Sequence, residues 1–397
     1  MATVSAVPTH TSPAIEKGHT HGAPSSIPWY LWCSALAVTC TSVGFAWDIS
    51  WHSTIGRDSF WNPAHVTIYM SAILAGIASG YLILTTTFKR ASAFRSTSVR
   101  VLGLRGPLGA FIAAWGGIAM LTSAPFDDWW HNAYGLDVKI ISPPHTLLFL
   151  GTRGIALGAL FLLLAALNRA SLQESAAFRP AQRLLLYLGV LAVADQMLFF
   201  SEAIRPTAQH SLTPYDAVAK FAFILLALFS AASRHRWAAT IMSSGYMVFV
   251  IGQILILPLF PAQPRLGPVY FPVTHMVPTH FPLLLVVPGL VLDLIRERTA
   301  SWRPTISAVV AGFVAIGAFV AVEWPFADFL LSPAAQNRFF GGGYFSYDAS
   351  PASRVLAFRM PEHGMHLVTG LLIAALYASV GIWLGGRLGT WMRGVQR

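Results

Sequence analysis

The stretch from Asp48 to His65 reads DISWHSTIGRDSFWNPAH, and a later stretch, from Asp127 to His145, reads DDWWHNAYGLDVKIISPPH. When the two are aligned, the same residues recur in the same order: an Asp, a Trp-His pair, a Gly, a second Asp, and a Pro shortly before a last His. The second copy has one residue inserted before its Pro. This agreement indicates that the chain contains two copies of one structural unit.

Apolar segments surround both copies. The chain has 397 residues, of which 55% are hydrophobic and only 11% are charged. Apolar runs of roughly 20 residues, long enough to span a bilayer as helices, recur along its length. We therefore expect an all-α, polytopic integral membrane protein with about ten transmembrane helices. The expected spans are 28–47, 64–86, 107–124, 146–167, 184–203, 215–232, 238–259, 279–295, 305–324 and 365–386.

Basic residues predict the topology. Lys and Arg gather in the loops after the second, fourth, sixth and eighth spans. The alternate loops are poor in them except for the longest, at about 325–364, which contains Arg338, Arg354 and Arg359, and long loops follow the positive-inside rule less well. By the positive-inside rule, both termini lie in the cytoplasm and both motif copies at the outer (periplasmic or extracellular) face of the inner, or cell, membrane. The net charge of +10 is then explained by these loops rather than by a nucleic-acid partner. Each motif joins an outgoing span to a returning one, so the repeats are parallel.

The repeated motif contains the ligands of a metal site. Asp48 and His52 are four residues apart and share one face of a helix, and His65 follows at the start of the returning helix. The second copy supplies Asp127, His131 and His145. Two imidazoles and one carboxylate suit copper, non-haem iron or zinc. A single such His is more often an interfacial polar residue, but two matched copies favour metal.

Other residues of the motif support this interpretation. The Gly after the first His and the Pro before the last His provide the bends that the elbow needs. Asp58 and Asp137 are placed to hydrogen-bond a ligand imidazole. Four aromatic residues are candidates for the lining of a substrate pocket: Trp51, Phe60, Trp130 and Phe149.

The D-x3-H-x12-H pattern of Asp48, His52 and His65 resembles the C subunit of the copper membrane monooxygenases (particulate methane and ammonia monooxygenase). The W-H, R-D and P-x-H pairs of this stretch are also similar to that subunit. The second copy resembles its second copper site, where the family usually has Asn in place of Asp127. The resemblance implies copper at both sites and dioxygen activation at the second, with Asp127, His131 and His145 as catalytic residues. It also implies a homo-oligomer, namely a trimer.

The second half of the chain resembles another subunit of the same family. Residues 270–295 read YFPVTHMVPTHFPLLLVVPGLVLDLI and are similar to the A subunit in the opening YFPV, the V-P, the P-G and the L-D before a basic loop. We therefore divide the chain into a disordered cytoplasmic tail (1–27), a C-subunit-like region (28–237) and an A-subunit-like region (238–397). No stretch resembles the B subunit, so the resemblance implies a separate cupredoxin-like partner and an electron donor.

Two further groups of polar residues have more than one interpretation. The first is either a buried ion pair, a relay or an ordinary structural pair: Arg153, Asp195, Glu202, Arg205 and Lys220. The second is either an additional metal site or a set of scattered interfacial residues: His275, His280, Glu362, His363 and His366.

The resemblance leads us to expect a copper-dependent monooxygenase-like protein that hydroxylates a small apolar substrate or ammonia. The alternative is a non-catalytic metal-binding membrane protein, acting in copper or zinc handling, in sensing or as a scaffold subunit. The ligands cluster at one face and the methionines form no ladder, which disfavours transport.

Overall fold

The computed structural model describes residues 26–56, 61–89, 92, 94–135, 141–200, 205–341, 344–352 and 358–396. The tail predicted over 1–27 lies outside the described residues except for its last two positions. Helices account for 72% of the structure and strands for 2%, which confirms the all-α fold class. Within the described ranges, nine helices are long and apolar enough to cross a membrane. The chain is therefore an integral membrane protein with several spans.

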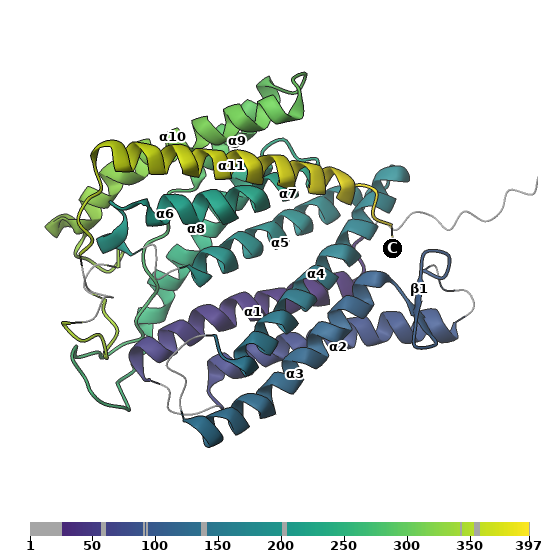
Figure 1. Cartoon of the computed structure of the whole chain (residues 1–397). Helices are drawn as coiled ribbons and strands as arrows, with labels where there is room; N and C mark the ends of the chain where they lie inside the picture. The colour runs from purple at the N-terminus through teal and green to yellow at the C-terminus, as the bar shows by residue number, and fades with distance from the viewer. Residues whose placement is uncertain are drawn as a thin grey trace, which may run out of the picture.

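The first half forms two helical hairpins and a fifth helix (Figure 1). The helices are α1 (Trp29–Thr54), α2 (Pro63–Phe88), α3 (Leu108–Tyr134), α4 (Pro143–Leu172) and α5 (Phe178–Phe199). A short antiparallel ribbon, β1 (Val99–Val101) and β2 (Leu104–Gly106), lies between α2 and α3. Helix α2 packs on both α1 and α3, and α1 also contacts α4 and α5.

Small residues allow the helices of the second hairpin to approach closely. A Cβ added at Gly116 would lie 2.6 Å from the backbone nitrogen of Ile155, and one added at Gly158 would lie 2.6 Å from the backbone of Ala113. Contacts of this kind between small residues are the usual way in which helices associate in a membrane. This close packing determines the relative position of the end of α3 and the start of α4, where the second motif lies.

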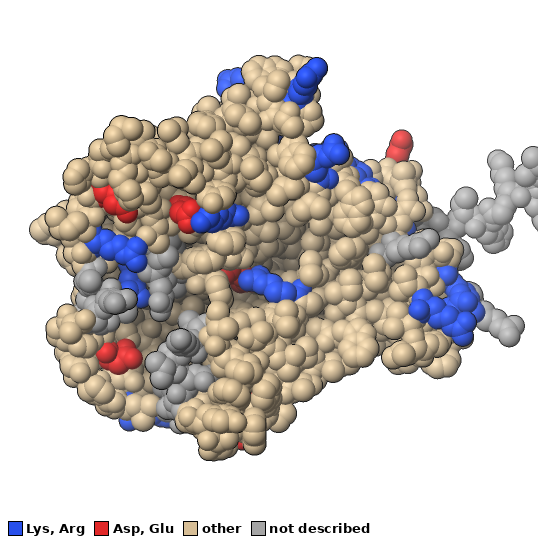
Figure 2. Space-filling view, viewed as in Figure 1, with Lys and Arg blue, Asp and Glu red and all other residues tan. Residues whose placement is uncertain are grey.

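In the second half, α7 packs against α11 and α8, and α10 packs against α11 and α9 (Figure 1). Its elements are η1 (Pro206–Ala208), α6 (Leu212–Ala217), η2 (Val218–Ala222), α7 (Phe223–Ser233), α8 (Ala238–Ile256), η3 (Leu257–Leu259), α9 (Val286–Arg298), α10 (Pro304–Leu331), η4 (Pro333–Ala335) and α11 (Gly364–Met392). Helix α11 runs along α7 and α10, and α5 packs against α7 and α8. Most of the face in Figure 2 carries no charged side chain, as expected of a surface that contacts lipid.

One predicted span is corrected by the structure. The prediction of a helix over 279–295 is wrong in its first part, because α9 begins only at Val286. Pro278 and Pro282 lack backbone N–H groups, and each disfavours a helical conformation in the residue before it. The amides of Leu283 and Leu284 instead donate to the hydroxyl of Tyr246 (3.2 Å) and to the carboxylate of Glu323 (2.8 Å).

Candidate metal centres

The first motif brings its three predicted ligands together. Asp48 and His52 lie in the last two turns of α1, and His65 lies in the first turn of α2. Oδ1 of Asp48 is 3.4 Å from Nε2 of His52 and 3.1 Å from Nε2 of His65. The three side chains are partly buried, with exposed fractions of 20% to 30%.

The second motif repeats this geometry. Asp127 and His131 lie near the end of α3, and His145 lies in the first turn of α4. Oδ1 of Asp127 is 3.5 Å from Nε2 of each imidazole. The ring centroids are 6.3 Å apart at an interplanar angle of 64°, against 6.1 Å and 63° for the imidazoles of the first cluster. The duplicated sequence therefore folds into a duplicated side-chain arrangement.

Both clusters fit a metal ion. In each, one atom from every ligand lies within 4.8 Å of the other two. Oδ1 of Asp48 and Oδ1 of Asp127 are both buried, yet neither accepts a hydrogen bond of good geometry from the described residues. A buried carboxylate oxygen without such a partner is costly, whereas a cation bound between it and the two imidazoles would compensate it. A donor set of two His and one carboxylate suits copper, iron or zinc.

The backbone around each last His explains why the elbow folds in the same way twice. The side chain of Asn62 accepts a hydrogen bond from the amide of His65 (2.7 Å), and that of Ser142 accepts one from the amide of His145 (3.4 Å). Each of these capping residues is followed by a Pro at the first helical position. The cap therefore fixes where the returning helix begins and how its His is directed.

The two elbows differ in what covers them. The end of α1 is contacted by two segments from the second half of the chain, which we call the roof (residues 265–277 and 344–349). Arg265 and Tyr347 donate backbone hydrogen bonds to the carbonyls of Ile55 (2.9 Å) and Ser53 (3.0 Å). The amide of Val277 donates to the hydroxyl of Thr54 (2.8 Å). These bonds satisfy polar groups that a helix end leaves without partners.

The end of α3 has no such cover from the described residues. A Cβ added at Gly135 would meet nothing within 4 Å, whereas one added at Gly56 would lie 2.5 Å from the hydroxyl of Tyr347. Aromatic side chains of this end contact one another: Phe126, Trp129, Trp130 and Tyr134. Trp129 is 54% exposed and Tyr134 is 67% exposed. The second cluster therefore lies beside an accessible aromatic surface.

The other predicted site residues are only partly placed. Asp58, Phe60, Asp137 and Glu202 lie outside the described residues. The ring of Phe149 packs between Phe45 of α1 and Phe199 of α5. Its role as a pocket residue, like that of Trp51 and Trp130, stays a prediction.

The predicted ionic group divides into separate interactions. Lys220 forms an ion pair with Asp216 at 2.7 Å, one turn away on the same helical segment. Asp195 interacts electrostatically with Arg153. Lys220 therefore pairs with Asp216, whose side chain is exposed, and this pair is not a buried one.

The remaining histidines do not assemble into a third cluster. In the described ranges, only the two motif clusters bring three potential ligands together. His366 pairs with Glu362 at 3.0 Å, and Nδ1 of His275 contacts the hydroxyl of Thr274. Of the two interpretations given to these residues, the structure favours scattered interfacial residues.

Sequence reasoning missed one close pair near the same end of the bundle. Nε2 of His210 lies 2.9 Å from Oδ1 of Asp328, and the imidazole is almost fully buried against the ring of Trp324. His210 precedes α6, whereas Asp328 lies near the end of α10. No local pattern connects two residues so far apart in the chain.

The comparisons with known proteins identify no relative: no family model, no curated protein and no solved structure matches this chain.

Proposed function

We propose that this chain is a copper-dependent, monooxygenase-like membrane protein that binds metal at both clusters. The observation that carries the proposal is the duplication of one three-ligand arrangement, with matching distances and ring angles, at the ends of two membrane hairpins. Charged and imidazole side chains at such a depth are costly and usually functional. The resemblance to the copper monooxygenases supports copper over iron or zinc.

We assign catalysis to the second cluster, formed by Asp127, His131 and His145. The end of α3 beside it is exposed and aromatic, which suits the entry of a small apolar substrate from lipid. Bound copper would supply the binding and reduction of dioxygen. The residues of the chain hold the ligands in place, and the apolar helices around them limit the access of water.

The proposed reaction needs other components. Hydroxylation inserts one oxygen atom of dioxygen into a C–H or N–H bond and releases the other as water, so it consumes two electrons and two protons from a reductant. We propose that a separate electron donor and a cupredoxin-like subunit provide this supply, and that the assembly is a homo-oligomer such as a trimer. The basic loops support an orientation with both termini in the cytoplasm and both clusters at the outer face.

One observation favours the alternative function for part of the protein. The last turn of α1, directly after His52 of the first cluster, is hydrogen-bonded by the roof, which ties the two halves of the chain together at this point. A metal site beside such a connection suits a structural or storage role. The alternative of a non-catalytic metal-binding protein would extend that role to both clusters.

Metal analysis of the purified protein tests the proposal. We expect about one copper for each intact cluster, with a nitrogen-ligated Cu(II) signal in the EPR spectrum. His52→Ala combined with His65→Ala should remove the first copper, and His131→Ala combined with His145→Ala the second. His363→Ala, outside both clusters, is the matched control. Metal content unchanged in either double variant would contradict that site.

Activity is tested separately. We expect oxygen-dependent turnover of small hydrocarbons or ammonia, given a reductant, to disappear in the variant of the second cluster and to persist in His363→Ala. Full metal loading with no oxygen consumption would favour the non-catalytic alternative. Iron in place of copper would retain the oxygenase class but change the metal.

A further inference from the structure

A groove with a volume of about 680 Å³ opens between α7, α9, α10 and α11. It lies where α11 ends, far from the metal clusters. Asn168, near the end of α4, donates hydrogen bonds to the carbonyls of Met392 (2.9 Å) and Val395 (2.7 Å), whereas His145 lies at the start of α4. A helix of 30 residues is roughly 45 Å long. The groove therefore lies at the opposite end of the bundle.

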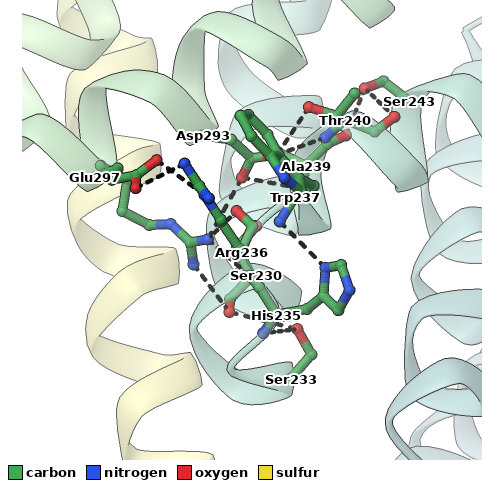
Figure 3. A network of polar contacts seen from close by, with 11 residues as sticks. Ser230, Ser233, His235, Arg236, Trp237, Ala239, Thr240, Ser243, Asp293 and Glu297 are labelled. Atoms are coloured by element: carbon green, nitrogen blue, oxygen red, sulfur yellow. Dashed lines mark hydrogen bonds and ion pairs between the residues drawn. The ribbon is translucent and has the colours of Figure 1, made fainter. Parts of the chain in front are cut away.

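The groove is positively charged. Three guanidinium groups line it, those of Arg296, Arg387 and Arg393, and no Asp or Glu is among the described residues of its lining. Arg296 is held by hydrogen bonds, because its Nη atoms donate to the backbone carbonyls of Ser230 and His235. Figure 3 labels both acceptor residues within a wider polar network. The positive charge of Arg296 is compensated by Asp293, which lies 3.5 Å away and is not part of the groove lining.

The guanidinium groups of Arg387 and Arg393 have N–H groups that are available to donate hydrogen bonds to a ligand. Nε of Arg393 donates to the carbonyl of Ala231 at 2.7 Å, but no bond from its terminal nitrogens is found in the described part of the chain. Arg387 has no hydrogen bond or ion pair with the described residues and is exposed. Burial, together with the positive charges of Arg234 and Arg296, lowers the pKa of Arg393. An anion in the groove would relieve this repulsion.

The walls of the groove are apolar and aromatic. Its aliphatic lining residues, such as Leu292 and Ile382, are buried, so the exposed apolar part of the lining is aromatic and includes Trp383. Trp302 is 49% exposed and Trp391 is 60% exposed, as expected for aromatic residues at the headgroup level of a membrane. An aqueous anion would leave the exposed tryptophan rings without a partner, whereas a molecule with an anionic head and an apolar tail would contact both the arginines and the rings.

We propose that this groove binds an anionic phospholipid, with the phosphate contacted by Arg387 and Arg393 and an acyl chain against the exposed tryptophan rings. Basic pockets between helices, at the level where the membrane meets water, are typical sites for such headgroups. The arginines are well suited to this role, because a planar guanidinium can bind two phosphate oxygens at once.

The test uses the full-length protein, stripped of lipid in detergent, with thermal unfolding as the readout. We expect phosphatidylglycerol to raise the melting temperature, and phosphatidylcholine and inorganic phosphate to leave it unchanged. Arg387→Gln, which removes no hydrogen bond or ion pair with the described residues, should weaken the apparent affinity for phosphatidylglycerol about fivefold, since a basic residue near the membrane contributes about 1 kcal/mol. Arg393→Gln should have a similar effect.

Arg100→Gln is the matched control, because Arg100 is an exposed arginine of β1 outside the groove. We expect this variant to bind phosphatidylglycerol like the unaltered protein. Three results would overturn the proposal: equal weakening by Arg100→Gln, no weakening by Arg387→Gln, or equal stabilisation by inorganic phosphate alone. Because neither the lipid nor these arginines takes part in metal binding, the result does not depend on the metal content.

Discussion

The hydroxyl of Tyr69 lies 3.4 Å from the hydroxyl of Ser123, and this contact joins the two helices that carry the metal clusters. Tyr69 is one helical turn after His65 on α2, and Ser123 is one turn before Asp127 on α3. Tyr69 also interacts electrostatically with both Asp48 and Asp127. A single side chain, that of Tyr69, therefore interacts with the carboxylates of both clusters, although the clusters lie on separate hairpins.

Removal of this hydroxyl tests how much the link stabilises the first half. We expect Tyr69→Phe to lower the free energy of unfolding by about 1 kcal/mol, because one hydrogen bond between uncharged groups is lost. Tyr81→Phe is the control, since Tyr81 is on the same helix and its side chain forms only ring contacts in the described structure. Thermal unfolding of the two variants in one detergent measures the difference. An equal loss in both would show that the link contributes nothing.

The two elbow glycines should differ in their tolerance of a side chain. Gly56 and Gly135 have φ values of 103° and 85°, so alanine is strained at both positions, by about 1 kcal/mol or more. Only at Gly56 would the new Cβ also displace Tyr347 of the roof. We expect Gly56→Ala to lose more stability than Gly135→Ala, and to lose the metal of the first cluster selectively. Melting temperatures and metal content check both expectations, which fail if the two variants behave alike.

The carboxylate of the second cluster can be tested by graded substitution. We expect Asp127→Asn to retain metal, because the amide oxygen is still a ligand and the copper monooxygenases usually have Asn at the corresponding position. Asp127→Leu has a similar size but no donor atom, so the metal of that cluster should be lost. Metal-to-protein ratios and EPR spectra distinguish the two results. Loss of metal in Asp127→Asn would show that this chain needs the negative charge.

Glu323 of α10 should stabilise the fold of the second half, since it is fully buried and accepts a hydrogen bond from the amide of Leu284. We expect Glu323→Leu to destabilise the protein by about 1–3 kcal/mol, because that amide would lose its partner away from water. Glu323→Gln keeps an acceptor oxygen and should cost less. Unfolding in detergent gives the comparison. A larger effect of glutamine than of leucine would mean that the hydrogen bond is not what Glu323 provides.

The ligand sets could be predicted from the sequence because every signal they depend on is local. Asp48 and His52 share a helix face, and the capping residue and Pro before His65 fix the start of the next helix. The hairpin then brings the three residues together without contributions from distant parts of the chain. The same reasoning holds for the second copy.

Features that depend on distant segments could not be predicted. The roof over the first elbow forms between residues that lie more than 200 positions apart, as in the bond from Val277 to Thr54, at a separation of 223. No local pattern encodes such a contact. The helix expected over 279–295 was wrong in its first part for another reason: hydropathy shows that a segment is apolar but not whether its backbone is helical.

The non-helical residues before α9 also depend on two other helices of the second half. The amides of Leu283 and Leu284 have no helical partners, and lipid offers none. Their acceptors are on Tyr246 of α8, which is synthesised earlier, and on Glu323 of α10, which is synthesised later. The extended conformation of residues 276–285 therefore depends on α8 and α10 together, because each helix supplies one of the two acceptors.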